Sequence, residues 1–413
     1  MRGVSGRVET TSAKNPEHGS HGGGRAEPHP GNMLAYRSLR GSASSDHLDL
    51  VRGAAALLVM LGHLRNLFFV DFSEVARNAN PLVKLVYLAT GFSHYAVMIF
   101  FVLSGFLVGG GVLRGRIDGK WNWTLYSTNR LTRLWLVLIP ALLIGAIWDH
   151  CGIHIFGTSG IYGGVARANV GIFAVQPRLS AGVMIGNALF LQDILTPTFG
   201  SNGPLWSLSY EFWYYVLFPL MLLAIPSGKV NWSTAPFAIA TLLVAVFIGE
   251  TICLYFLIWL LGASINLAPE RPGGRGSLWI VVGAAAVVLV VAVVKFKPGS
   301  TEYSDFMVGV ASAVLIYALL RSPARSRSGL YSRAARGLAG FSYTLYVVHL
   351  PALVFISAWL VPQRRWQPDA VHVAMVAGLG ICALVYAFAI ARLTEYRTDV
   401  VRSRVTAAIG PHG

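Results

Sequence analysis

Charged residues are scarce in this chain. Only 12% of its 413 residues are Asp, Glu, Lys or Arg, whereas 54% are hydrophobic. Ordinary soluble domains carry about 25% charged residues, and a soluble protein of this composition could not keep its surface hydrated. The composition therefore excludes an ordinary soluble domain and predicts a polytopic α-helical membrane protein.

Cysteine and acidic residues are also few. Cys151, Cys253 and Cys382 are too few and too scattered for a disulfide framework or a zinc motif, so we expect no metal cofactor. The net charge is +15, which in a soluble protein would suggest nucleic acid as a partner. Here the Lys and Arg residues lie at the ends of apolar segments and in short loops, as membrane topology requires. We therefore expect no nucleic-acid partner.

Apolar segments follow one another through most of the chain. The segments at 236–250 and 252–267 are short, and only Glu250 and Thr251 separate them. Together the segments predict an all-α membrane domain over 47–395, a bundle of about ten transmembrane helices. The ten predicted segments are 49–70, 92–113, 131–149, 204–226, 236–250, 252–267, 277–295, 305–320, 338–361 and 369–393.

The distribution of positive charge sets the predicted orientation. One set of loops collects most of the arginines, and cytoplasmic loops carry such an excess, so both termini are predicted to be cytoplasmic and the protein to lie in the inner (plasma) membrane. Residues 1–46 have no apolar period and read as a disordered cytoplasmic tail; 396–413 form a second cytoplasmic tail. Met1 and Met33 both remain open as the start of the protein.

The longest external connection is predicted at 150–203. It is rich in Gly and poor in charge, and a loop of more than about 15 residues is usually functional or disordered. The apolar patch from Val183 to Leu195 within it is expected to lie on or dip into the membrane. We interpret the loop as a cap over an outward-facing cavity.

The first apolar segment carries Arg52 and, further along, His63. At about 100° and 1.5 Å per residue, the two side chains lie within about 20° of one helix face and roughly 16 Å apart. Ionisable groups at membrane depth usually face a bundle interior or a wet cavity and mark function. The simpler alternative is that Arg52 is a cytoplasmic anchor and His63 a hydrogen-bonded packing residue.

A second polar stretch opens the segment at 204–226, where Trp206, Ser207 and Tyr210 precede Glu211. Glu211 and His63 are each predicted about 10 Å from the outer ends of antiparallel helices, so they reach the same depth. A carboxylate beside an imidazole would hold its tautomer, as an orienting group does for a general base. Alternatively, Glu211 only bonds a neighbouring helix.

Arginines and a third polar stretch follow. Arg130 and Arg133 are one helical turn apart and can face one phosphate-rich ligand, although ordinary inside-flanking arginines would look the same. Tyr343, Tyr346 and His349 recur every three residues and so lie on one side of a helix, where His349 is most simply a buried hydrogen-bonding residue. Pro351 removes a backbone donor from the same helix and is expected to kink it.

Taken together, these stretches resemble the acyltransferase-3 family of membrane proteins. Arg52 and His63 resemble its Arg-x10-His signature. The other similar blocks are Phe-Phe-Val-Leu-Ser-Gly-Phe-Leu (100–107), Arg-x-x-Arg (130–133), Leu-Trp-Ser-Leu-Ser-Tyr-Glu (205–211) and Ser-Tyr-Thr-Leu-Tyr-Val-Val-His-Leu-Pro (342–351). They occur in the family's order over roughly 47–395.

The resemblance implies a ten-helix bundle that moves an acyl group, usually acetyl from coenzyme A, to a hydroxyl of a carbohydrate or lipid-linked glycan. It implies that His63 and Glu211 are catalytic and that Arg130 and Arg133 contact the coenzyme; we expect Arg52 to contact it or to hold the inner end of a tunnel. The implied partners are an acyl-CoA such as acetyl-CoA, a carbohydrate or glycolipid acceptor, and membrane lipids. Further residues expected to contact substrate or support the site are Trp206, Ser207, Tyr210, Tyr346 and His349.

We predict that His63 is the general base and Glu211 its partner. Direct transfer is the simpler mechanism because Ser104-Gly105 is not part of a Gly-x-Ser-x-Gly nucleophile elbow, but an acyl-histidine intermediate stays open. Some relatives carry an extracytoplasmic esterase-like domain, which we expect this chain to lack. The alternatives are a transporter or flippase, whose related halves are not seen in this sequence, and a passive anchoring protein, which leaves the intramembrane His and Glu unexplained.

Overall fold

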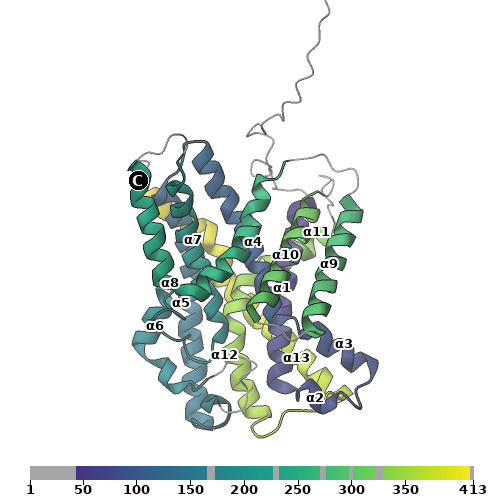
Figure 1. Cartoon of the computed structure of the whole chain (residues 1–413). Coiled ribbons are helices and arrows are strands. Elements are labelled where there is room, and N and C mark those ends of the chain that lie inside the picture. Colours follow the sequence, from purple (N-terminus) through teal and green to yellow (C-terminus); the bar gives the residue numbers. More distant parts are fainter. Residues whose placement is uncertain are drawn as a thin grey trace, which may run out of the picture.

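The computed structural model describes residues 43–164, 173–226, 232–269, 276–296, 301–321 and 329–409, which are almost entirely helical. The long helices run side by side between the two ends of the molecule (Figure 1). They are α1 (Ala43–Phe68), α4 (Ser93–Ile117), α5 (Trp123–Phe156), α7 (Trp206–Ala224), α8 (Ala235–Ser264), α9 (Gly276–Phe296), α10 (Thr301–Leu320), α12 (Ser342–Leu360) and α13 (Ala370–Leu393). The shorter helices are α2 (Phe72–Val75), α3 (Pro81–Thr90), α6 (Ala181–Ala188), α11 (Leu330–Ala339) and α14 (Thr398–Ile409), with 3₁₀ turns between some of them.

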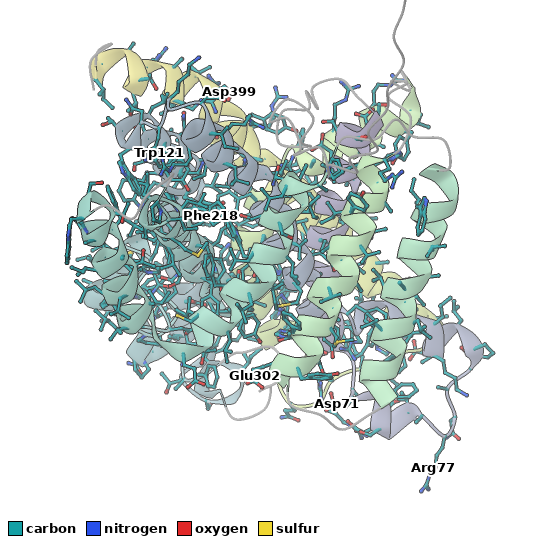
Figure 2. The ribbon with its side chains drawn as sticks, turned by 45° about the horizontal axis from the view of Figure 1, so that its top comes forward. Asp71, Arg77, Trp121, Phe218, Glu302 and Asp399 are labelled. Atoms are coloured by element: carbon teal, nitrogen blue, oxygen red, sulfur yellow. The ribbon has the colours of Figure 1, made fainter. Side chains whose placement is uncertain are left out.

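The two ends of the bundle differ in content. We call the end where α1 begins, and where α11 and α14 lie, the basic end; the other end, with α2, α3 and α6, is the loop end (Figure 1). Side chains such as Trp121 and Asp399 lie at the basic end, and Asp71, Arg77 and Glu302 at the loop end (Figure 2). The described chain therefore begins and ends at the same end of the bundle.

Length and composition confirm the predicted membrane class. Within the described residues, seven helical stretches are long and apolar enough to cross a bilayer, against the ten segments expected from the sequence. The seven stretches are Ser44–Phe68, Pro81–Ile117, Trp123–Phe156, Trp232–Leu267, Glu302–Leu320, Ser342–Leu360 and Ala370–Ile409.

Helix α8 breaks sharply at Gly249, which has φ 83° and ψ 171°. The Sγ atom of Cys253 lies 3.5 Å from the carbonyl oxygen of Ala245, although eight residues of straight helix would rise about 12 Å. The chain therefore reverses at Gly249, where a glycine adopts the positive φ at little cost. The two arms of this hairpin correspond to the separate segments 236–250 and 252–267 of the sequence prediction.

Close packing between α4 and the second arm of α8 places the centre of the bundle. A Cβ atom on Gly105 would lie 1.9 Å from the carbonyl oxygen of Trp259, and one on Gly262 would lie 1.9 Å from that of Val102. Small residues of this kind let helix backbones approach in a membrane, where packing drives association. Trp259 Nε1 also bonds Ser104 Oγ at 3.2 Å. The Ser104-Gly105 pair is thus a helix contact, which fixes α4 beside α7 and α8.

The predicted tails and loop need correction at their borders. Residues 43–46 of the expected 1–46 tail form the first turn of α1. The buried carboxylate of Asp46 accepts a 2.5 Å hydrogen bond from Ser332 and so holds this turn against α11. Residues 1–42 lie outside the described residues. The C-terminal tail contains α14. In the predicted 150–203 loop, α5 continues to Phe156 and α6 forms a further helix, while 165–172 lie outside the described residues.

Candidate active site

Two histidines from different helices meet inside the bundle. Nδ1 of His63 on α1 lies 2.7 Å from Nε2 of His349 on α12, and the rings stack with centroids 5.0 Å apart. Nδ1 of His349 lies 2.7 Å from the carbonyl oxygen of Leu345, one turn earlier. A carbonyl oxygen can only accept, so this nitrogen carries the proton of His349. In a neutral pair His349 Nε2 therefore accepts from His63 Nδ1–H, and the tautomer assigned by these bonds leaves His63 Nε2 unprotonated.

The local chain holds His349 in place. Pro351 follows two residues later and has no N–H, so the carbonyl of Val347 loses its helical donor. Asn202 fills this gap, because its Nδ2 donates to the Val347 carbonyl oxygen at 2.7 Å. The side chain of His349 is fully buried, at 0% exposure. The hydrogen bond that Pro351 cannot make to the Val347 carbonyl is thus replaced by one from the side chain of Asn202, just before α7.

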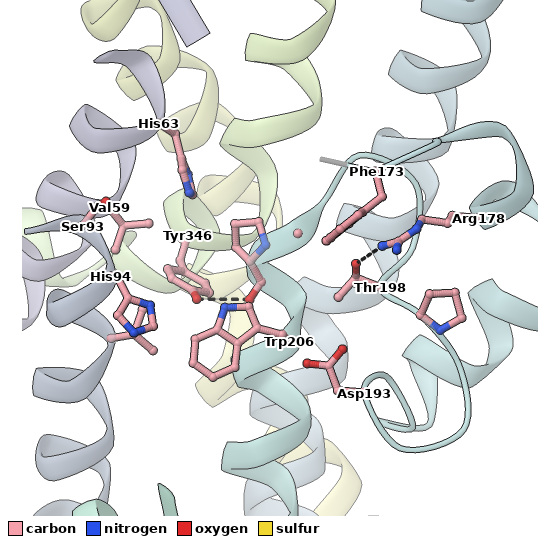
Figure 3. Close-up of a pocket in the computed structure, with 14 residues that line it drawn as sticks. Val59, His63, Ser93, His94, Phe173, Arg178, Asp193, Thr198, Trp206 and Tyr346 are labelled. Carbon is pink, nitrogen blue, oxygen red and sulfur yellow. Dashed lines mark hydrogen bonds between the residues drawn. The ribbon is translucent and has the colours of Figure 1, made fainter. Parts of the chain in front are cut away.

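A cavity of about 500 Å³ opens beside His63 toward the loop end; we call it the histidine cavity. Figure 3 shows His63, His94 and Tyr346 on one side of it, and Phe173, Arg178, Thr198 and Asp193 on the other. The lining is completed by Trp206 and by Val59, Ser93, Val97, Pro197, Gly203 and Pro204. Arg178, Asp193 and Thr198 belong to the 150–203 connection, so this connection lines a cavity; that the cavity faces outward stays a prediction.

A second, smaller cavity of about 100 Å³ lies on the side of the basic end; we call it the arginine cavity. Arg52, Arg130 and Arg133 line it together with Glu211 and Tyr215. Arg52 pairs with Asp49 at 3.0 Å, yet the Nε atoms of Arg52 and Arg130 are buried without a hydrogen-bond partner among the described residues. The three arginines of the sequence prediction therefore meet in one place, with hydrogen-bond donors left over.

Tyr346 lines both cavities, as does Val97. The Tyr346 hydroxyl donates to the carbonyl oxygen of Pro204 at 3.1 Å and shares a 2.7 Å hydrogen bond with Ser207 Oγ. These bonds join α12 to the start of α7. Tyr346 and Val97 thus lie between the two cavities, and Ser207 bonds Tyr346 from the side of the arginine cavity. Tyr210 packs against Trp206 with ring centroids 4.9 Å apart, in an aromatic cluster that includes Phe101.

The structure corrects the expected partner of His63. Glu211 lines the arginine cavity, and its Oε1 accepts a hydrogen bond from the Tyr215 hydroxyl four residues later. His63 instead bonds His349 and lines the histidine cavity. Equal depth along two helices does not fix the direction in which each side chain points, so the sequence could not separate these two arrangements.

Sequence reasoning missed the polar residues that the loop end contributes. Arg178 Nη1 donates to Thr198 Oγ1 at 3.0 Å, and its guanidinium lies 4.4 Å from the centre of the Phe173 ring. Burial raises the pKa of the Asp193 carboxyl, an effect that Arg178 opposes, and burial lowers the pKa of Arg178. The rarity of charge within the 150–203 connection was the signal that could have identified both residues.

The fold and these two cavities form a candidate site inside an apolar helical bundle, and comparison with known proteins assigns the class of the protein. The sequence model of the acyltransferase-3 family, described as "Acyltransferase domain", matches residues 46–391, so the chain belongs to this family of acyltransferases. The chain is 25% identical over 323 residues to "Acyltransferase MdmB" of Streptomyces mycarofaciens, covering 75% of this chain and 68% of the relative. No solved structure matches the chain in this comparison.

Proposed function

We propose that this protein is an integral-membrane O-acyltransferase that moves an acetyl group from acetyl-CoA to a hydroxyl of a carbohydrate or lipid-linked glycan. The observation that carries the proposal is the shared wall: Tyr346 separates a cavity lined by three arginines from one lined by an oriented histidine. A long, thin donor that passes Tyr346 would present its acyl end to His63 while its polar part stays with the arginines.

The arginine cavity suits the donor because coenzyme A is polyanionic. Arg52, Arg130 and Arg133 line this cavity together with one carboxylate, that of Glu211, while Asp49 pairs with Arg52 from outside the lining. Guanidinium groups bind phosphate through planar, bidentate hydrogen bonds. Coenzyme A is a cytoplasmic molecule, and the arginine-rich loops predict that the basic end faces the cytoplasm. We therefore assign the donor to this cavity and Glu211 to the donor side of the reaction.

The histidine cavity suits an acceptor hydroxyl. Trp206 presents an indole, and Arg178, Asp193 and Thr198 present hydrogen-bonding groups opposite His63 (Figure 3). A sugar offers this set of partners an apolar ring face and several hydroxyls. On the proposed orientation, the loop end lies outside the plasma membrane, where surface polysaccharides and lipid-linked glycans are modified.

The proposed reaction needs one base. His63 Nε2 takes the proton of the acceptor hydroxyl as its oxygen attacks the thioester carbonyl. The C–S bond then breaks, and the coenzyme A thiolate takes the proton from His63 to leave as the thiol. His349 positions His63 by accepting from its Nδ1–H, so the reactive nitrogen faces the cavity with its lone pair free.

The test uses the full chain in lipid nanodiscs with acetyl-CoA labelled in the acetyl group. Release of free coenzyme A thiol is measured with a panel of acceptors that includes octyl β-glucoside and isolated surface polysaccharide, and the label is followed by mass spectrometry. We expect thiol release together with a labelled ester, and neither from His63→Ala. Translocation of an acceptor without thiol release would overturn the enzyme proposal in favour of a transporter or flippase.

A further inference from the structure

The histidine cavity contains a second histidine with its own buried acid. Nε2 of His94, on α4, lies 2.8 Å from Oδ2 of Asp305, near the start of α10. The Asp305 side chain is 0% exposed, whereas that of His94 is 44% exposed and lines the cavity. The same carboxylate oxygen accepts the hydroxyl of Tyr255 on α8. Three helices therefore converge on a carboxylate that the reaction described so far does not use.

The charge of Asp305 needs a counterion. A buried carboxylate at membrane depth is costly unless a positive group pairs with it. The ion pair that the structure gives Asp305 is with His94, and Oδ1 has no hydrogen-bond partner among the described residues. Because a carboxylate can only accept, Nε2 of His94 carries a proton, which leaves Nδ1 to act toward the cavity.

The two cavity histidines differ in their partners. A protonated His94 forms a neutral pair with Asp305, whereas a protonated His63 has only the uncharged imidazole of His349 beside it. The Asp305 carboxylate is thus placed as a counterion for a positive charge on His94, whereas His349 offers His63 no such counterion. In enzymes, two titratable groups with different surroundings often take different roles, one as the acid and the other as the base.

We propose that His94 is a second catalytic residue, whose protonated ring donates a hydrogen bond from Nδ1 to the carbonyl oxygen of the acyl thioester, and that Asp305 positions it. This inference rests on the proposed acyl transfer. As the acceptor oxygen bonds to the thioester carbon, the carbonyl electron pair moves to the oxygen and is stabilised by His94. The pair returns as the C–S bond breaks, and the His94 proton stays on His94 throughout.

Infrared spectroscopy of acetyl-CoA labelled with ¹³C at the carbonyl tests the hydrogen bond directly. With the full chain in nanodiscs, we expect the bound thioester band at lower frequency than in water. The shift should disappear in His94→Ala and shrink in Asp305→Asn, a change that keeps the shape of the side chain. His372→Ala is the matched control, because His372 pairs with Asp369 at 2.6 Å outside both cavities and should keep the shift.

Kinetics supply the second readout, with thiol release from acetyl-CoA in the presence of octyl β-glucoside. We expect kcat of His94→Ala to fall about 100-fold, the typical effect of removing one oxyanion donor, with KM for acetyl-CoA changed less than about threefold. A band that is unshifted in the wild-type protein, or that stays shifted with full turnover in His94→Ala, would overturn the proposal. Failure of the wild-type protein to bind acetyl-CoA would instead overturn the proposed function.

Discussion

Nδ1 of His63 lies 2.7 Å from Nε2 of His349, so an imidazole, and not a carboxylate, orients the proposed base. The bond from His349 Nδ1–H to the Leu345 carbonyl fixes the tautomer of His349. Through the bond between the two rings, it also fixes the tautomer of His63 and leaves His63 Nε2 unprotonated. In this tautomer both rings are uncharged, which suits their burial inside a membrane bundle.

We predict that His63→Ala abolishes acyl transfer while binding of acetyl-CoA is kept. His63→Gln should not rescue, because an amide cannot take up the acceptor's proton. His349→Ala should lower kcat, and the double variant should be little worse than His63→Ala, since the two rings act as one unit. Thiol release and a binding titration on each nanodisc preparation measure this; substantial turnover by a folded His63→Ala protein contradicts it.

The proposed donor site predicts that Arg130→Ala and Arg133→Ala raise KM for acetyl-CoA. Loss of one charge-assisted hydrogen bond costs about 1.5–3 kcal/mol, or roughly 10- to 100-fold in affinity. Lys should rescue only in part because it lacks the planar fork. Arg404→Ala, at an exposed position on α14, is the control. Unchanged affinity in the double Ala variant would remove these arginines from the donor site.

For Glu211 we predict that Glu211→Gln acts on the donor side. Its Oε1 accepts from Tyr215 within the arginine cavity, so loss of the charge should alter KM for acetyl-CoA more than kcat. The pH profile of kcat should be retained, because His63 has a different partner. A drop in kcat at constant KM with a shifted profile would return Glu211 to the role of a partner for His63.

Packing predicts the outcome of adding one methyl group to α4. Gly105→Ala places its Cβ 1.9 Å from the Trp259 carbonyl oxygen, a backbone atom that cannot rotate away. Overpacking of this kind costs about 1–3 kcal/mol, so the unfolding midpoint should fall. Gly111→Ala is the matched control on the same helix, since a Cβ there meets nothing within 4 Å. Thermal unfolding in detergent measures both, and equal midpoints would contradict the close contact.

Asp193, at the loop end, leads us to predict that the stability of the protein depends on pH. Burial raises the pKa of its carboxyl in the folded protein, so the folded state binds more protons than the unfolded state. Its stabilising contribution is thus complete below about pH 4, the usual Asp pKa, and is lost as the pH rises. We expect the melting temperature of the wild-type protein relative to Asp193→Asn to fall between pH 4 and pH 7. Asp399→Asn, 85% exposed at the basic end, is the control.

Much of the fold was predictable because a bilayer demands long apolar helices, and most predicted segments match helices within a few residues. The contacts between helices could not be predicted from the sequence. The depths of His63 and Glu211 in the membrane follow from counting residues. The direction in which each side chain points from its helix depends on helix packing, such as that of Gly105 against Trp259. His94 and Asp305 could have been singled out as intramembrane ionisable residues; their pairing needed three dimensions.

The Tyr346 partition has a consequence for the energetics of the membrane. On the proposed orientation, the two cavities approach each other from the two faces of the membrane, and Tyr346, bonded to Ser207 and Pro204, stands between them with Val97. An open connection there would let protons run down the electrochemical gradient. The proposed passage of a thioester arm therefore requires Tyr346 to fit around that arm and to close the connection when the arm withdraws, so that acyl transfer leaves the proton-motive force intact.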